Sequence, residues 1–123
     1  MEHLVDLDAL AGRLTSVVEE WRCRATVGPL TWHDEVAGWP RPIASDRSTV
    51  QVPDSLGFTL QPHATEGELD IVIWTGGWAD VGYMLDGEIC NSCPEFQDVD
   101  GAHAAVVQEV ESFLELGRAR PRR

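Results

Sequence analysis

The stretch LDIVIWTGGWADVGYMLDGEICN, residues 69–91, decides the fold. It holds three short runs rich in β-branched, aromatic and large apolar residues, at 69–75, 78–85 and 88–91, and a similar run precedes them at 57–61. Gly76-Gly77 and Asp86-Gly87 separate the last three runs and suit two-residue hairpin turns. The pattern predicts an antiparallel β-meander of about four strands between residues 56 and 92. Pro94 should end the last strand, because proline cannot donate to a ladder.

A helix is predicted on each side of this meander. From Leu4 to Arg24 the apolar residues recur every three or four positions, and Asp6 or Asp8 is a suitable N-cap. A second apolar stripe, which Asp98 or Asp100 can cap, runs from Ala102 to Leu114 and should stop at Gly117. We therefore expect one α+β domain over residues 1–117, followed by a flexible arginine-rich tail at 118–123.

Residues 25–55 join the first helix to the meander. Four prolines and two glycines interrupt any regular pattern there, so short extended pieces are expected, among them a strand at Thr49–Val52. The segment also carries Trp32 and Trp39, which we expect to anchor it as it wraps the core.

The chain is strongly acidic, with a formal net charge of −12 over 123 residues. Such a surface repels phosphate backbones, which argues against nucleic-acid binding. It would attract a basic protein and speed its encounter. The alternative is that the acidity only keeps the protein soluble, and charge alone does not separate the two readings.

The sequence carries no sign of membrane insertion or of a cofactor. No apolar run approaches the roughly 20 residues that span a bilayer, and the N-terminus is acidic where a secretory signal would be basic, which predicts a cytoplasmic protein. Cys90 and Cys93 have the spacing of half a zinc site or of a redox pair, but nothing completes either. One core cysteine and one turn cysteine are expected, with no metal and no cofactor.

Two-residue turns would fix which side chains share a face of the sheet. Trp74 would lie opposite Ala79 and Val72 opposite Val81, on the face that packs against the helices. The opposite face would then carry the residues Ile71, Ile73, Thr75, Trp78, Asp80, Met84, Ile89 and Asn91. That face is either covered by the segment from Trp32 to Trp39, the reading we favour, or left as a partner-binding surface.

The candidate contact residues lie on and beside this second face. Trp78 would supply an aromatic centre, and the carboxylates that follow would form an acidic rim facing arginines or lysines of a partner. The predicted partner-binding residues are Trp78, Asp80, Glu88, Asn91 and Glu95.

No catalytic residue is predicted. An enzyme would have to bring His33, His63 or His103 together with carboxylates in a concave site. Trp32-His33-Asp34-Glu35 places an imidazole beside two carboxylates, but neighbouring loop residues rarely converge on one atom, so a solvated loop is the favoured interpretation.

The chain resembles the small immunity proteins and antitoxins encoded beside secreted bacterial toxins. The likeness lies in its compact acidic α+β layout, with WTGGWADVGY on one hairpin and FQDVDGA leading into the last helix. The resemblance implies a cytoplasmic inhibitor that binds a toxin domain, often occluding its active site. Two other classes stay open: a homodimeric regulatory or structural protein that uses the second face or an unpaired edge strand, and a small-molecule-binding enzyme.

Overall fold

The computed structural model describes residues 2–38 and 42–119. Two helices and a six-stranded antiparallel sheet make up an α+β fold. The elements are, in chain order, α1 (Leu7–Trp21), β1 (Ala25–Val27), β2 (Thr31–Asp34), the 3-10 helix η1 (Arg47–Thr49), β3 (Pro53–Pro62), β4 (Gly67–Trp74), β5 (Trp78–Leu85), β6 (Glu88–Ser92) and α2 (Val99–Ala119).

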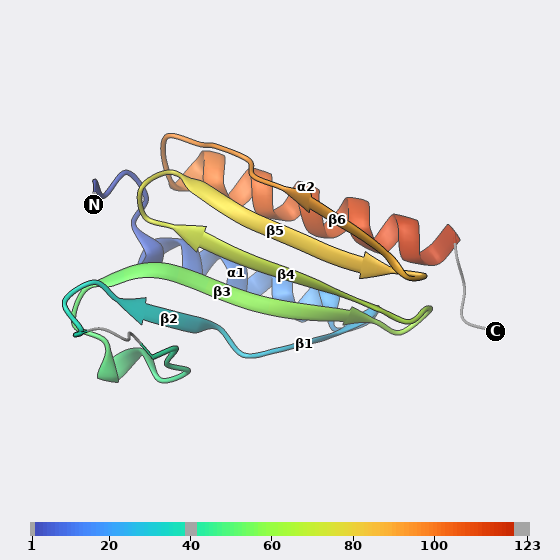
Figure 1. Cartoon of the computed structure of the whole chain (residues 1–123), viewed down its shortest axis with the longest axis horizontal. Helices are drawn as coiled ribbons and strands as arrows, with labels where there is room; N and C mark the ends of the chain where they lie inside the picture. Colours follow the sequence, from blue (N-terminus) through green and yellow to red (C-terminus); the bar gives the residue numbers. More distant parts are fainter. Residues whose placement is uncertain (1, 39–41, 120–123) are drawn as a thin grey trace.

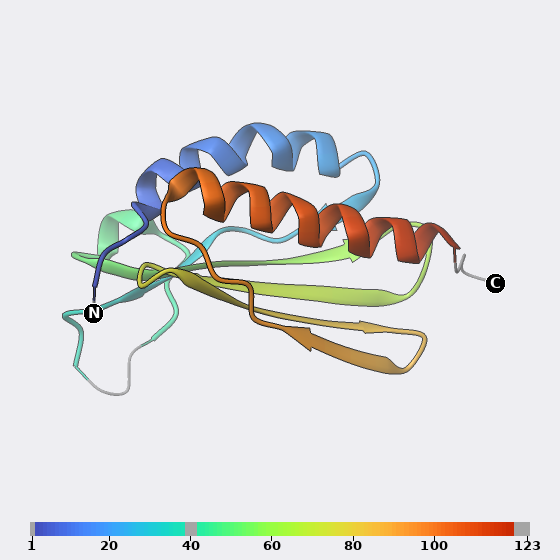
Figure 2. The same cartoon turned by 90° about the horizontal axis from the view of Figure 1, so that it is seen from above.

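The sheet is a meander extended at one edge. Its strand order is β1-β3-β4-β5-β6, and both β1 and β2 pair with β3: β1 with its last three residues and β2 with its first half (Figure 1). Both helices lie on one face of the sheet (Figure 2). The meander and the two flanking helices are confirmed, and β1 and β2 are the short extended pieces expected before it.

Each helix buries one apolar stripe against the sheet. Asp6 caps α1, accepting a hydrogen bond of 3.1 Å from the backbone N–H of Ala9, as expected. In α2 the predicted stop at Gly117 is wrong, because the helix runs on to Ala119. Gly117 is buried there, and a Cβ would lie 3.1 Å from a methyl group of Thr65, so the glycine serves close packing. Of the predicted tail, residues 120–123 lie outside the described residues.

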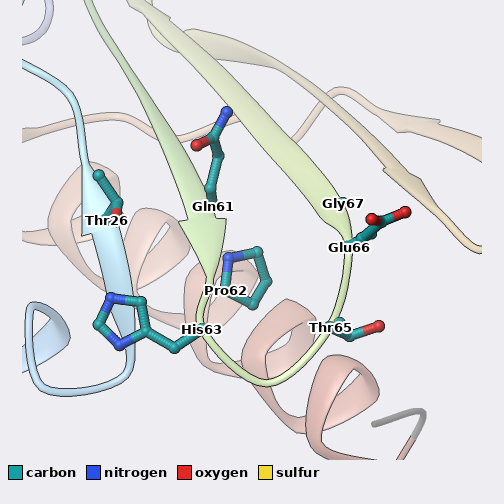
Figure 3. A pocket seen from close by; sticks show the side chains of 7 residues that line it. All are labelled: Thr26, Gln61, Pro62, His63, Thr65, Glu66 and Gly67. Atoms are coloured by element: carbon teal, nitrogen blue, oxygen red, sulfur yellow. The ribbon is translucent and has the colours of Figure 1, made fainter. Parts of the chain in front are cut away.

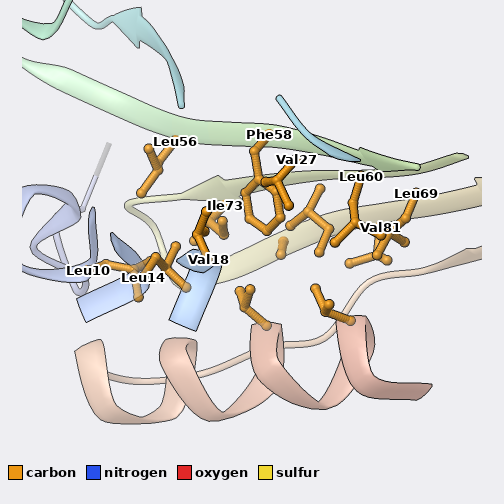
Figure 4. Packing of buried hydrophobic residues seen from close by; sticks show 14 of the residues in the cluster. Leu10, Leu14, Val18, Val27, Leu56, Phe58, Leu60, Leu69, Ile73 and Val81 are labelled. Carbon is orange, nitrogen blue, oxygen red and sulfur yellow. The ribbon is translucent and has the colours of Figure 1, made fainter. Parts of the chain in front are cut away.

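The core fills the space between the helices and the sheet (Figure 4). Trp21, which is fully buried, stacks on Phe58 of the interior strand β3 with ring centroids 6.0 Å apart. Leu10 and Leu14 of α1 have no exposed surface. Burying each such leucine stabilises the fold by about 2 kcal/mol, so this layer fixes the position of the sheet.

The first hairpin differs from the prediction. Trp74 pairs with Trp78, not with Ala79, so the connection holds three residues and the register moves by one. The cause is Thr75, which is buried and whose hydroxyl donates a hydrogen bond of 2.7 Å to the carbonyl of Val5. The N-terminal segment therefore holds Thr75 out of the strand. The predicted faces are exchanged on β4: Ile71 and Ile73 pack in the core, while Val72 and Trp74 face away from the helices.

The second hairpin has the predicted two-residue turn. Leu85 pairs with Glu88, and Asp86 and Gly87 both take positive φ angles, of 51° and 79°. Residues 88–92 therefore keep the expected register with β5.

The strand predicted at Thr49–Val52 is wrong. Thr49 ends the 3-10 helix, and the backbone N–H groups of Gln51 and Val52 donate to the carboxylate of Asp34. A side chain thus takes the donors that a ladder would need.

Neither described helix combines the length and the apolar character needed to cross a bilayer.

Candidate functional site: the outer face of the sheet

The outer face is the face of the sheet that points away from both helices, and the strand register shows which residues lie on it. Residues directly opposite one another in antiparallel strands share a face and form rows across the sheet. One row, called here the aromatic row, runs through His33, Ser55, Trp74, Trp78 and Glu95. Three further rows follow toward the other end of the sheet: Thr31, Gly57, Val72 and Asp80; then Thr59, Asp70, Gly82 and Asn91; then Glu68, Met84 and Ile89.

The aromatic row is a stack of three rings. The ring centroids of His33 and Trp74 are 5.9 Å apart, with an angle of 11° between the ring planes. Those of Trp74 and Trp78 are 6.2 Å apart, with an angle of 23° between the planes. Nδ1 of His33 is 2.6 Å from the hydroxyl of Ser55, which holds the imidazole in the row. Trp74 and Trp78 are half-buried, so their outer edges reach solvent. The row thus offers a rigid aromatic surface.

A carboxylate is fixed beside this row. The indole N–H of Trp74 donates a hydrogen bond of 3.0 Å to Oδ2 of Asp80, which is itself exposed. The thiol of Cys93 lies 3.9 Å from the other oxygen of that carboxylate. Asp80 is therefore oriented before any partner arrives, which lowers the entropic cost of using it in binding.

Beyond Asp80 the outer face is hollowed. Gly82 has no side chain, and a Cβ there would lie 3.0 Å from Oδ1 of Asn91. The hollow is about 510 Å³, and its lining includes the carboxylates of Asp70 and Asp80 and the apolar side chain of Val72. Its shape and chemistry fit a side chain with an apolar stem and a cationic end.

The charged form of the Asp70 carboxylate is disfavoured in the folded protein. Its burial, and the neighbouring carboxylate of Glu68, raise the pKa of Asp70 above its ordinary value. Glu68 accepts a hydrogen bond of 3.3 Å from the side chain of Gln61. The two carboxylates thus repel one another on the open side of the sheet, and a cation between them would relieve the repulsion.

The described arginines are all engaged elsewhere. Each bonds a carboxylate on or beside a helix, in the pairs Arg13 with Asp100, Arg22 with Glu19, Arg24 with Glu111, Arg47 with Asp8 and Arg118 with Glu115. The rows of the outer face contain four carboxylates and no arginine. The described arginines are therefore distributed unevenly, and none of them bonds a carboxylate of the outer face.

Four of the five predicted contact residues meet on this face. Trp78 and Glu95 are paired, and Asp80 and Asn91 lie in the following rows. Glu88 does not join them, because it pairs with Leu85 on the helix side at the other end of β5. The sequence reasoning missed Trp74, His33 and Asp70. The signal for Trp74 was present in the doubled tryptophan, but the assumed two-residue turn placed its side chain on the wrong face.

Trp32 does not contribute to the expected cover of the outer face. Trp32 is buried on the helix side, opposite Leu56, with the Arg47 guanidinium 5.5 Å from its ring centroid. Trp39 lies outside the described residues. Met84 and Ile89, with 50% and 71% of their surface exposed, show that the end of the outer face remote from the aromatic row is open.

The cysteines are not in the core. Cys23, Cys90 and Cys93 are all exposed and free, so the expected core cysteine is wrong. Cys90 pairs with Tyr83 on the helix side of β6, an edge strand that no helix covers fully, whereas Cys93 lies beside Asp80 on the outer face. The two thiols thus lie on opposite sides of the sheet.

The candidate histidines His33, His63 and His103 lie on different segments and make different contacts, whereas His3, which was not a candidate, has its Nε2 3.0 Å from Oε2 of Glu35. Asp34, next to His33, uses its carboxylate to accept backbone N–H groups. His63 lines a polar hollow at the β3–β4 connection, where its side chain and that of Glu66 point to opposite sides (Figure 3). Burial and the nearby Arg13 lower the pKa of His103. Within residues 2–38 and 42–119, no group of histidine, cysteine and carboxylate side chains is placed to hold a metal ion.

The chain matches no protein-family model, and no curated protein or solved structure shows significant similarity to it.

Proposed function

We propose that this chain is a non-catalytic protein-binding module, an immunity protein that neutralises a basic toxin domain in the cytoplasm by binding it. One observation carries the proposal: the outer face presents four carboxylates around a stacked aromatic row, while every arginine the structure describes bonds a carboxylate on or beside a helix.

The surface has the chemistry of a binding patch rather than of a solvated one. Aromatic side chains held rigid by neighbours give large contact area at low entropic cost. The Trp74 hydrogen bond holds Asp80 in place, and Glu95 closes the row. A partner with exposed arginine or lysine would complement both parts, and the electrostatic attraction would speed its association.

A rescue experiment tests the proposal. The protein encoded next to this chain is induced in bacteria, and growth is measured with and without the chain. Restored growth, lost in the double variant Asp80→Asn and Glu95→Gln, is the expected result. The matched control is Glu19→Gln with Glu115→Gln, which removes two charges from the helix side and should rescue as the original chain does. Equal rescue by both double variants would show that the outer-face carboxylates do not contribute to binding the toxin.

A further inference from the structure

We propose that the free edge of β6 receives an extended segment of the basic partner as an additional antiparallel strand. This inference rests on the proposed function for the identity of the partner, and it specifies how that partner is held. Recognition would then combine backbone hydrogen bonds along the edge with basic side chains on the outer face.

The hydrogen-bond pattern shows which groups are available. The N–H of Ala79 donates to the carbonyl of Pro94 at 3.0 Å, and the N–H of Phe96 donates to the carbonyl of Gly77 at 2.9 Å. These bonds flank the pair Trp78 and Glu95, so the backbone groups of Glu95 point away from β5.

The same alternation continues back along the strand. Ser92 pairs with Val81 and Cys90 with Tyr83 in unbroken register, so residues 88, 90, 92 and 94 face β5. The backbone N–H and C=O groups of Ile89, Asn91, Cys93 and Glu95 therefore point to the open edge. The edge extends over seven residues, 89–95, although β6 itself ends at Ser92.

This edge lacks the usual protection. Natural edge strands are shielded by proline, lysine, bulges or a covering element. All five residues of β6 are exposed, and β6 is the outermost strand of the sheet, which touches α2 only on its helix side, where the hydroxyl of Ser92 donates to Glu109 at 3.2 Å (Figure 2). Pro94 does not block the edge, because the N–H it lacks would have pointed toward β5.

The opposite edge is closed to such an addition. It is divided between β1, which has three residues, and β2, which has four. Trp32 in β2 already exchanges both backbone hydrogen bonds with Ala44, at 2.8 and 2.9 Å. A continuous free edge is thus found on β6 in the described chain.

Charge selects the occupant. Ile89, Asn91, Cys93 and Glu95 carry their side chains on the outer face, next to Asp80 and the glycine hollow. In an antiparallel addition, the partner residues whose N–H groups bond β6 place their side chains on that same face. Basic residues at those positions would meet the carboxylates. A second copy of this chain is disfavoured, because each copy carries a charge of −12.

The test uses the full chain and a short capped peptide in which arginine and threonine alternate. Amide shifts of the isotope-labelled protein are followed by NMR as the peptide is added, because this detects weak binding. Shifts centred on the amides of Ile89, Asn91, Cys93 and Glu95 are expected. N-methylation of the arginines should weaken binding about tenfold or more, whereas N-methylation of the threonines should leave it, since only the arginine N–H groups bond the edge.

Three results would overturn the inference. Shifts confined to the Trp74 and Trp78 indoles, insensitive to N-methylation, would mean that the face binds cations without strand addition, and the proposed function would stand. If no residue shifts, the β6 edge does not bind the peptide and the inference is wrong. The growth rescue would then test the proposed function separately. Edge amides protected without peptide, increasingly at higher protein concentration, would assign the edge to a second copy.

A variant of the chain supplies an independent measurement. Cys93→Pro removes one outward N–H without touching a bond to β5, and it should reduce the peptide-induced shifts. Cys93→Ala removes the thiol and keeps the N–H, which separates the two contributions. A Cys93→Pro protein that melts as the original does and binds the peptide equally well would contradict the inference.

Discussion

The indole N–H of Trp74 reaches across to the neighbouring strand and donates to Asp80, while the Trp74 ring lies 6.2 Å from that of Trp78. Both tryptophans therefore lie on one face of the sheet, directly opposite each other in the ladder.

The Trp74–Trp78 stack should be visible spectroscopically. Two indoles held at this distance and angle couple their excited states, so the far-ultraviolet circular dichroism should contain a paired positive and negative band. Trp78→Phe and Trp74→Phe should each abolish that band while leaving the helix signal unchanged. Persistence of the band in both variants would assign it to other tryptophans and contradict the register.

Gly76→Ala should displace Trp78 without removing it. A Cβ at this position would lie 2.4 Å from Cζ3 of Trp78, so the ring must move. We expect a loss of about 1–3 kcal/mol in the free energy of unfolding, measured with urea, and a reduced coupled band. The control is Gly12→Ala, where a Cβ meets no atom within 4 Å on α1, and which should stabilise by about 0.5–1 kcal/mol. Equal behaviour of the two variants would contradict the packing of Trp78 on Gly76.

Asp70→Asn should stabilise the free protein and weaken partner binding. Because the folded-state pKa of Asp70 is raised, the charged carboxylate is disfavoured in the fold at neutral pH. The variant should gain roughly a few tenths of a kcal/mol at pH 7. The gain should disappear as the pH falls below the ordinary value of 3.8, where the carboxyl is protonated in both states. Urea denaturation at the two pH values measures it, and a gain that is the same at both would contradict the electrostatic cause.

Glu111→Gln should destabilise in a pH-dependent way. Glu111 accepts hydrogen bonds from Arg24, at 2.9 and 3.0 Å, and from the indole of Trp21, and these lower its pKa, with the Arg24 contact contributing most. A lowered folded-state pKa stabilises above the unfolded value of 4.5 and loses that effect as pH falls through the folded value. Since both partners are partly exposed, we expect a cost below about 1 kcal/mol at pH 7 that vanishes in acid.

Glu111→Ala provides the comparison for that measurement. It leaves the N–H of the buried Trp21 without its acceptor, which costs about 1–3 kcal/mol at any pH. A constant difference between Glu111→Gln and the original chain from pH 7 to acid pH would show that the ion pair is not the source.

Local pattern was enough to predict the meander, the two helices and the turn at Asp86-Gly87, because each depends on residues close in sequence. The first hairpin was not predictable in this way. Its three-residue turn is held by a hydrogen bond from the Thr75 hydroxyl to the carbonyl of Val5, and these two residues are 70 positions apart in the sequence. The strand predicted at Thr49–Val52 is wrong for the same reason, because the Asp34 carboxylate that binds the N–H groups of Gln51 and Val52 is distant in the sequence.

The wrong turn length also affected the prediction of the candidate site. Trp78, Asp80, Asn91 and Glu95 follow from their own strand positions, so the sequence places them together. The partnership of Trp74 with Trp78 depends on the register, which the turn sets. The exclusive pairing of the described arginines with carboxylates on or beside the helices is a property of the folded surface, and no local pattern carries it.

The division of the far edge between β1 and β2 limits stoichiometry. Sheets with two receptive edges can add strands at both and grow into fibres, whereas a sheet with one receptive edge stops after a single addition. With Ala44 occupying the backbone groups of Trp32, residues 2–38 and 42–119 offer one continuous edge, that of β6, to an added strand. An assembly built through β6 therefore ends at one partner per chain, whatever the concentration of either protein.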